Sequence, residues 1–250
     1  MSYTNKLAIR DSGPEVQNVI IGIIGRKGTG KSTITREILK RSRRLFVFDT
    51  ANDHGWIPDT FVQIDEAVLF IFDKGTSEAD YKARYIPEEE EEDDALVRDV
   101  NEIAKMIWET GNVCFVIEEL PMMSSAQWAP AKVKRLFRLG RHRGINLLYT
   151  GQRAAEIPRI ATHSTDVFIL FHTSEPLDLD RISERCGPEC AAVVSALGDH
   201  EFVVFDVRQK SLIEIDSQWY DSVLISSNNH TPAIGGRTGR SARWSFEDAE

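Results

Sequence analysis

The chain has 250 residues, of which 42% are hydrophobic, and it carries a formal net charge of −9. A chain of this size can fill one large core, and its longest apolar runs, at residues 19–24 and 113–117, are far shorter than the roughly 20 residues that a membrane-spanning helix needs. We therefore expect a soluble intracellular protein with one large domain and no transmembrane segment. Its three cysteines, Cys114, Cys186 and Cys190, predict no disulfide framework and suit a reducing compartment.

The charge is segregated along the chain. Residues 120–155 contain no acidic residue and seven basic ones, so this segment carries +7 and leaves −16 for the remainder. An average charge of −9 argues against a nucleic-acid partner, but a basic segment creates a local field that the average hides. The most acidic segment is a run of seven consecutive acids at residues 88–94, which is either a solvated loop or an interaction surface.

In chain order, a polar N-terminal arm (residues 1–18) precedes a run of apolar, β-branched residues at 19–24. Such a run without alternation is typical of a strand buried on both faces of a parallel sheet. The same pattern predicts strands at residues 44–49, 68–72, 113–117, 145–149 and 167–171, and helical patterns lie between them at residues 32–42, 95–110, 127–140 and 177–186. Alternating strands and helices predict an α/β fold with a mainly parallel central sheet flanked by helices.

The C-terminal part of the chain predicts an edge and a tail. Residues 201–207 and 212–215 flank a polar turn and are predicted to form a hairpin at the sheet edge. From residue 226 to 250 the composition is rich in Gly, Ser, Asn and Thr, which predicts a flexible tail. The expected organisation is an arm (1–18), one domain (19–225) and a tail (226–250).

The segment that follows the first strand matches the phosphate-binding pattern GxxxxGK[ST] in full, between a predicted strand and a predicted helix. The residues expected to hold a nucleoside triphosphate are Gly25, Arg26, Lys27, Gly28, Thr29, Gly30, Lys31, Ser32 and Thr33. Glycines let backbone N–H groups converge on phosphate oxygens, and the helix N-terminus adds partial positive charge. Lys31 should reach the β and γ phosphates, and the Ser32 hydroxyl should join the shell of a Mg²⁺ ion. The predicted ligands are therefore ATP and Mg²⁺.

Two acids follow the strand at residues 113–117, at the edge where ligands bind in open α/β sheets. Glu118 is predicted to hold Mg²⁺, and Glu119 to act as the base that polarises a water for attack on the γ phosphate. Gln152, after the next strand, is predicted to sense that phosphate. Asp49 has two readings, as an outer partner of Mg²⁺ or as a cap of the segment that follows it.

Residues 135–187, together with the acid pair, resemble the FtsK/HerA superfamily of DNA-pumping ATPases, and the resemblance extends over residues 19–205. It implies a RecA-like (ASCE) P-loop fold and a homo-oligomeric ring, usually a hexamer, with ATP between neighbours and double-stranded DNA in the pore. Within that pattern Arg141 corresponds to an arginine finger that acts on the neighbour's ATP, and Arg143 and Arg153 are rivals for this role. An arginine supplied in this way raises hydrolysis by about 10³–10⁵-fold.

The predicted helix at residues 127–140 has Val133, Leu136 and Phe137 on its core face. The other face carries the candidate DNA contacts, which are Lys132, Lys134, Arg135 and Arg138. Such contacts would bind phosphates without reading bases. The alternative is a solvated basic face that balances acidic neighbours.

The resemblance indicates an ATP-driven DNA translocase, most like the genome-packaging motor of a virus, because the chain has room neither for the barrel of cellular HerA proteins nor for the membrane helices of FtsK. Such a motor would work in the host cytoplasm or at a virion vertex, docked on a capsid or membrane protein through the arm, acidic run or tail. One alternative is a cellular HerA-like translocase or helicase that works with a nuclease. Another is a P-loop kinase or nucleotide switch that does not act on DNA.

Overall fold

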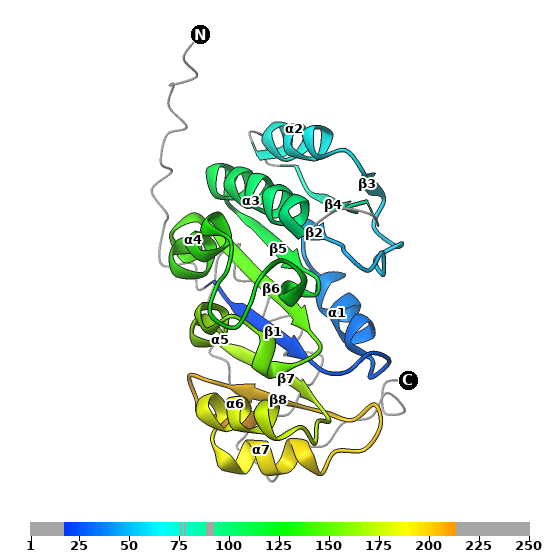
Figure 1. Ribbon diagram of the computed structural model, residues 1–250. Coiled ribbons are helices and arrows are strands. Elements are labelled where there is room, and N and C mark those ends of the chain that lie inside the picture. Colours follow the sequence, from blue (N-terminus) through cyan, green and yellow to red (C-terminus); the bar gives the residue numbers. More distant parts are fainter. Residues whose placement is uncertain (1–17, 76, 78, 89–92, 214–250) are drawn as a thin grey trace.

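The computed structural model describes residues 18–75, 77, 79–88 and 93–213. Within these residues, nine strands form one sheet in the order β3-β4-β2-β5-β6-β1-β7-β8-β9 (Figure 1). The strands are β1 (Ile20–Ile24), β2 (Arg44–Phe48), β3 (Asp59–Phe61), β4 (Tyr81–Tyr85), β5 (Val113–Ile117), β6 (Ile145–Gly151), β7 (Val167–Phe171), β8 (Phe202–Asp206) and β9 (Ser211–Ile213). The first seven are parallel, and β8 and β9 are antiparallel at one edge.

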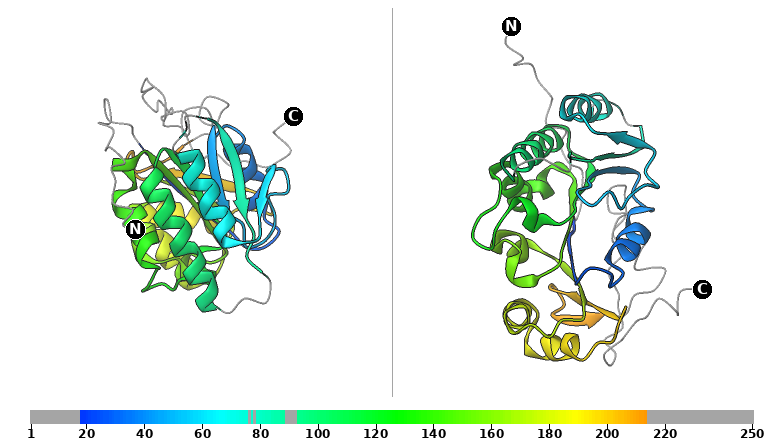
Figure 2. Two further views of the ribbon diagram at one scale, coloured as in Figure 1. Left: turned by 90° about the horizontal axis from the view of Figure 1, so that it is seen from above. Right: turned by 45° about the vertical axis from the view of Figure 1, so that its right-hand side comes forward.

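Helices cover both faces of this sheet, and Figure 2 shows α1 on the opposite side from α3 and α4. The α-helices are α1 (Lys31–Leu39), α2 (Ile64–Gly75), α3 (Asp93–Thr110), α4 (Ala131–Leu139), α5 (Arg159–Ser164), α6 (Pro176–Cys186) and α7 (Pro188–Ser195). Three short 3₁₀ helices are η1 (Leu120–Met123), η2 (Gly140–Arg143) and η3 (Ala154–Glu156). Two apolar clusters fill the core, one between the sheet and α1, and the other between the sheet and α2–α7.

The buried strands confirm the predicted α/β class. Every residue of β5, β6 and β7 is buried, which is why these strands read as continuous apolar runs rather than as an alternation. The hairpin predicted at the sheet edge is also confirmed. The strands β8 and β9 pair with each other antiparallel, and β8 joins them to the sheet by pairing with β7. The strand β1, which precedes the phosphate-binding turn, and the strand β5, which precedes Glu118 and Glu119, both neighbour β6. The ends of these three strands therefore meet at one edge.

The strand predicted at residues 68–72 is wrong, because these residues lie inside α2. Only Ala67 and Ile71 of this helix are buried, at the four-residue spacing of one helix face. Leu69 and Phe72 are apolar but exposed, by 60% and 43% respectively. These exposed apolar side chains hide the helical period and make the segment resemble a buried strand.

The sequence did not predict β3 and β4. The strand β4 reads Tyr-Lys-Ala-Arg-Tyr, and two cations do not suggest a strand in a sheet interior. Arg84 is nevertheless 8% exposed and pairs with the buried Asp49, at 2.9 Å between Nη1 and Oδ2, so the charge is compensated. Residues 1–17 of the predicted arm, the predicted tail and residues 89–92 of the acidic run lie outside the described residues.

In the described part of the chain, none of the helices combines the length and the apolar character that crossing a membrane requires.

Candidate ATP site

The phosphate-binding turn lies between the end of β1 and the start of α1. Gly28 and Gly30 have φ angles of +82° and +104°, which favour glycine because a Cβ would be strained there. The helix α1 begins without a side-chain cap and without an acidic residue in its first turn. Its first N–H groups and its partial positive charge are thus available for an anion. Arg26 and Lys27 are exposed beside this turn.

Lys31 connects the turn to Glu119, which follows β5. Its Nζ donates hydrogen bonds to the carbonyl oxygens of Gly25 (2.7 Å) and Arg26 (3.1 Å), and it lies 3.8 Å from Glu119 Oε1. Burial lowers the pKa of Lys31, against the raising effects of Glu119 and Glu118. A largely buried ammonium beside carboxylates can exchange its carbonyl contacts for phosphate oxygens when a nucleotide enters.

The two predicted acids differ in environment. Glu118 is 6% exposed, and both of its carboxylate oxygens accept hydrogen bonds, Oε1 from the ring of His54 (2.7 Å) and Oε2 from the Thr150 hydroxyl. Glu119 is less buried and adopts a left-handed backbone conformation (φ 47°, ψ 55°), while its N–H donates to Thr150 Oγ1 at 2.9 Å. A non-glycine residue in this conformation is strained, and such strain clusters at functional sites.

The environment of Glu119 suits a base. Burial raises the pKa of Glu119, and the neighbouring charge of Glu118 acts in the same direction, while Lys31 and a hydrogen bond with Gln152 oppose the shift. A carboxylate whose pKa lies above the ordinary value accepts a proton more readily than an exposed one. Gln152 reaches Glu119 because β6, which ends at Gly151, runs beside β5.

The loop after β2 was missed as part of the site. The Ser32 hydroxyl donates to Asp53 Oδ2 at 2.7 Å, and His54 Nε2 contacts Glu118. Asp49 accepts the backbone N–H groups of Asp53 (3.0 Å) and His54 (3.1 Å), so its contacts are those of a cap, one of its two predicted readings. Asp53 and His54 come four and five residues after Asp49, which was the only available sequence signal.

His54 is buried, with a ring that is 1% exposed. Burial works against a charged ring, but the hydrogen bond and charge of Glu118, together with Asp49 and Asp53, outweigh it and raise the pKa of His54. The carboxylates around this ring therefore favour a proton on it.

The donor set fits Mg²⁺. Among the described residues there is no cluster of three or more His, Cys, Asp or Glu side chains that could hold a metal ion alone. Mg²⁺ does not need one, because it is commonly held by one or two carboxylates, water and the phosphates of a nucleotide. Ser32 and Glu118 are the predicted protein ligands, and both lie at this edge of the sheet.

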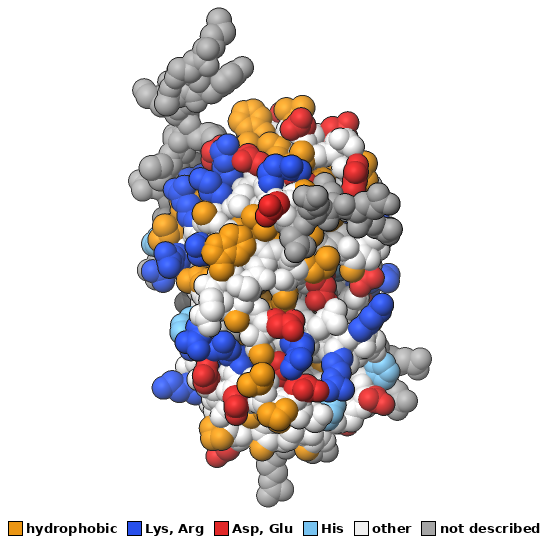
Figure 3. All heavy atoms as spheres, viewed as in Figure 1, with side chains coloured by type: hydrophobic (Ala, Val, Ile, Leu, Met, Phe, Trp, Pro, Cys, Tyr) orange, Lys and Arg blue, Asp and Glu red, His pale blue; other side chains and the backbone are white. Residues whose placement is uncertain are grey.

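The basic helix α4 has the predicted orientation. Val133, Leu136 and Phe137 are buried. Of the candidate DNA contacts, Lys132, Arg135 and Arg138 are exposed and Lys134 is half-buried. Arg135 stacks on Trp108 of α3, with its guanidinium carbon 3.9 Å from the ring centre. None of the four cations forms an ion pair with a described residue, and Figure 3 shows Lys and Arg side chains gathered over this region.

The three candidate arginine fingers lie in different places. Arg141 and Arg143 precede β6, so a seven-residue strand, roughly 20 Å long, separates them from the ATP site of their own chain. Arg143 is engaged with α3, where it donates to the carbonyl oxygens of Trp108 and Glu109. Arg141 is exposed and lines a hollow of about 290 Å³.

Arg153 lies on the ATP-site edge of its own chain instead. Its Nε is 3.3 Å from Asp178 Oδ2, and its Nη2 is 3.7 Å from Glu175 Oε2. Glu175 also contacts Arg26 of the phosphate-binding turn, at 3.4 Å. These contacts join the segment after Gln152 to the turn within one chain.

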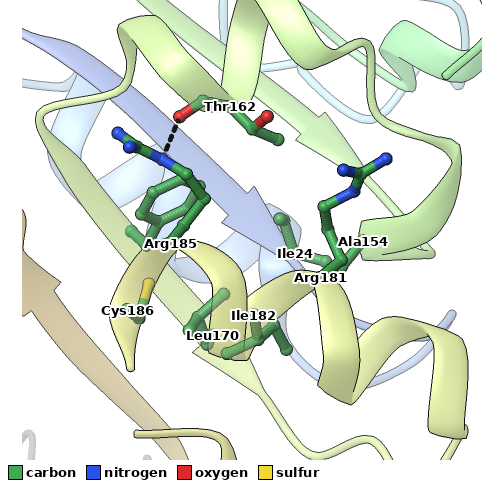
Figure 4. Close-up of a pocket in the computed structure, with 9 residues that line it drawn as sticks. Ile24, Ala154, Thr162, Leu170, Arg181, Ile182, Arg185 and Cys186 are labelled. Atoms are coloured by element: carbon green, nitrogen blue, oxygen red, sulfur yellow. Dashed lines mark hydrogen bonds between the residues drawn. The ribbon is translucent and has the colours of Figure 1, made fainter. Parts of the chain in front are cut away.

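A second hollow near this edge is too small for a nucleotide. It lies under α6 and holds about 10 Å³, the size of one water at most. Figure 4 shows its lining, where Arg185 Nε donates to the carbonyl oxygen of Thr162. This hollow is therefore not the site of the predicted nucleotide.

No protein-family model matches the chain, and no curated protein matches it either. Solved structures do match. The genome packaging NTPase B204 from Sulfolobus turreted icosahedral virus 2, in complex with ATP-gammaS, is similar with a TM-score of 0.62 and 19% identity over 78% of this chain and 95% of that chain.

Two further structures are similar in fold. B204, the DNA-packaging ATPase from Sulfolobus turreted icosahedral virus, has a TM-score of 0.59 and 21% identity over 78% of this chain and 97% of that one. VirB4 of Thermoanaerobacter pseudethanolicus has a TM-score of 0.56 and 12% identity, over 80% of this chain and 90% of its own. The chain therefore shares the P-loop fold of these proteins, which is the fold that its resemblance to the FtsK/HerA superfamily implied.

Proposed function

We propose that the chain is an ATPase that moves double-stranded DNA, and that it serves as the genome-packaging motor of a virus. The observation that carries the proposal is the connection between the predicted base and the basic helix. Glu119 is followed directly by η1, whose Leu120 and Met123 are buried, and the loop after it leads into α4. The 3₁₀ helix η1 and the seven residues after it thus connect the predicted base to the basic face, and a change at the γ phosphate would pass along this segment.

Each residue of the site has a role in hydrolysis. The turn and the α1 N-terminus bind the phosphates, Lys31 neutralises charge on them, and Glu119 takes a proton from the attacking water. Gln152 orients this water or the γ phosphate. Ser32 and Glu118 would hold Mg²⁺, which would supply neutralisation of the phosphate charge. Glu118 accepts hydrogen bonds from His54 and Thr150 on its two carboxylate oxygens.

The DNA partner is supported by charge and by fold. Four cations of α4 have no described ion-pair partner, which disfavours a face that only balances acidic neighbours. The similar B204 structures are those of genome-packaging proteins. A motor of this kind would act as a ring, usually a hexamer, in the host cytoplasm or at a virion vertex. Capsid or membrane-protein docking belongs to the same proposal.

The test measures ATP hydrolysis and duplex binding together. We expect duplex DNA to stimulate hydrolysis and its binding to weaken steeply with salt. In the double variant Lys132→Gln/Arg138→Gln, the slope of log affinity against log salt should fall by about 1.8 if both cations contact phosphates. The matched control is Lys40→Gln/Arg43→Gln, which removes two exposed cations away from α4 and should leave the slope unchanged.

Two results would contradict the proposal. The first is brisk hydrolysis that duplex DNA does not change, which would favour the kinase or switch alternative. The second is an equal slope in the α4 variant and the wild type, which would remove α4 as the contact surface. A cellular translocase or helicase shares the whole site, and the duplex assays do not separate it from a packaging motor.

A further inference from the structure

The loop between β2 and β3 places two side chains against the two predicted Mg²⁺ ligands. Asp53 accepts the proton of the Ser32 hydroxyl, at 2.7 Å, and His54 Nε2 lies 2.7 Å from Glu118 Oε1. The ligands come from α1 and from the end of β5, so one loop connects both sides of the predicted metal site. The GxxxxGK[ST] turn and the acid pair contain neither residue.

The shape of this loop is set by a buried scaffold rather than by its own side chains. The Asp49 carboxylate is fully buried and accepts the N–H groups of both Asp53 and His54. Arg84 Nη1 donates to Asp49 (2.9 Å) and to Asn52 Oδ1 (2.8 Å). Because these contacts involve only the protein, Asp53 and His54 are in position before a nucleotide arrives.

The hydrogen bonds leave oxygen lone pairs available. A hydroxyl has one proton, and the Ser32 hydroxyl donates it in the hydrogen bond to Asp53, so the lone pairs of Ser32 Oγ stay free for a cation. Each oxygen of Glu118 accepts one hydrogen bond, from His54 or from Thr150, and retains further acceptor capacity. With Glu118 ionised, Nε2 is the His54 nitrogen that carries the proton, whether the ring is neutral or charged.

The oxygens of these residues are the donors that Mg²⁺ prefers. Hydrogen bonds from neighbouring residues commonly hold metal ligands in orientation, and the loss of such a partner typically lowers metal affinity 10–100-fold. We propose that Asp53 is a further residue of the Mg²⁺ site, and that His54 is a positioning residue that holds Glu118 toward the metal. This inference rests on the proposed ATPase function.

The test measures binding and not hydrolysis. The affinity for AMPPCP is determined by calorimetry with excess Mg²⁺ and again in EDTA, and the ratio of the two gives the Mg²⁺-dependent gain. We expect Asp53→Asn to lower this gain by at least about tenfold and to leave the affinity in EDTA unchanged. The matched control, Asp59→Asn, changes an exposed acid at the start of β3 and should keep the gain of the wild type.

Two His54 variants separate positioning from packing. In His54→Gln the amide nitrogen takes the place of Nε2 and can still donate to Glu118, whereas in His54→Asn it takes the place of Nδ1 and cannot. We expect His54→Asn to lose about tenfold of the Mg²⁺-dependent gain and His54→Gln to retain most of it. Their affinities in EDTA report whether the phosphate-binding turn is intact.

The outcomes are distinct. If the Mg²⁺-dependent gain in AMPPCP affinity is as large in both Asp53→Asn and His54→Asn as in the wild type, the inference is overturned and the proposed function stands. Equal losses in His54→Gln and His54→Asn, or losses that appear equally in EDTA, assign the loop a packing role and also overturn it. If Mg²⁺ does not strengthen AMPPCP binding to the wild type, the metal site itself is absent, and the proposed function fails together with the inference.

Discussion

Replacing Glu119 by Gln removes the predicted base while keeping the shape of the side chain. The amide has the same volume and can still hydrogen-bond Gln152, but it cannot take a proton from water. Positioned general bases contribute about 10²–10⁴-fold to rates. Because burial raises the pKa of Glu119, its carboxylate is a better proton acceptor than an exposed one. We therefore expect hydrolysis to slow at least about 100-fold, which corresponds to about 2.7 kcal/mol of barrier.

The same substitution should not weaken ATP binding. Glu119 Oε1 lies 3.8 Å from the ammonium of Lys31, so its negative charge faces the place where the γ phosphate should bind. Removing that charge reduces repulsion, and the ATP dissociation constant should stay equal or decrease. Single-turnover hydrolysis and equilibrium binding of a fluorescent ATP analogue measure the two quantities separately.

The control is Glu102→Gln, which changes an exposed carboxylate of α3 that pairs with Lys105 at 3.5 Å. It should hydrolyse ATP at the wild-type rate. If Glu119→Gln turns over within about threefold of the wild type, well under the range for a general base, Glu119 is not the base. A loss of rate that is matched by an equal loss of ATP affinity would also refute the reasoning, because it would indicate a damaged binding turn.

Three further substitutions test other parts of the structure. Arg141→Ala subunits should be inactive alone but regain hydrolysis when mixed with inactive Lys31→Ala subunits, because each supplies what the other lacks at a shared site; no recovery in the mixture contradicts a finger in trans. Arg84→Met removes the cation of a buried ion pair and should lower the free energy of unfolding by about 3 kcal/mol, measured by denaturant titration. Gly22→Ala should cost about 1–3 kcal/mol of stability by overpacking, since its new Cβ would lie 2.5 Å from the hydroxyl oxygen and 2.7 Å from Cζ of the buried Tyr149; an unchanged free energy of unfolding in the same titration contradicts this packing.

The parts of the site that were predicted share one property, which is that each follows directly after a buried strand. Lys31 and Ser32 follow β1 through a recognisable turn, Glu118 and Glu119 follow β5, and Gln152 follows β6. Parallel strands bring their carboxyl ends to one edge, so the order of strands and helices alone predicted that these residues converge. The actual pairing of strands was not needed for that conclusion.

The parts that were missed depend on which strands are neighbours. His54 reaches Glu118 because β2 pairs with β5 although 64 residues separate the two side chains. No local sequence pattern predicts such a contact. The same holds for Arg84, whose charge is acceptable inside β4 only because Asp49 lies beside it. The wrong prediction of a strand at residues 68–72 has a different cause. The helix α2 carries apolar side chains that no described element covers.

The positions of the ATP site and of Arg141 constrain how subunits of the proposed ring can associate. The site lies where β1, β5 and β6 end, whereas Arg141 precedes the first residue of β6 and so lies at the opposite edge of the sheet. A residue at that edge can act on ATP only if another subunit presents the ATP to it. In a two-fold interface each contact of residue i with residue j is repeated as a contact of j with i, so the association closes at two subunits and forms no larger ring. A head-to-tail interface instead pairs one edge with the other and repeats until a ring closes, so in the proposed ring the edge that carries Arg141 would face the phosphate-binding turn of the neighbouring subunit.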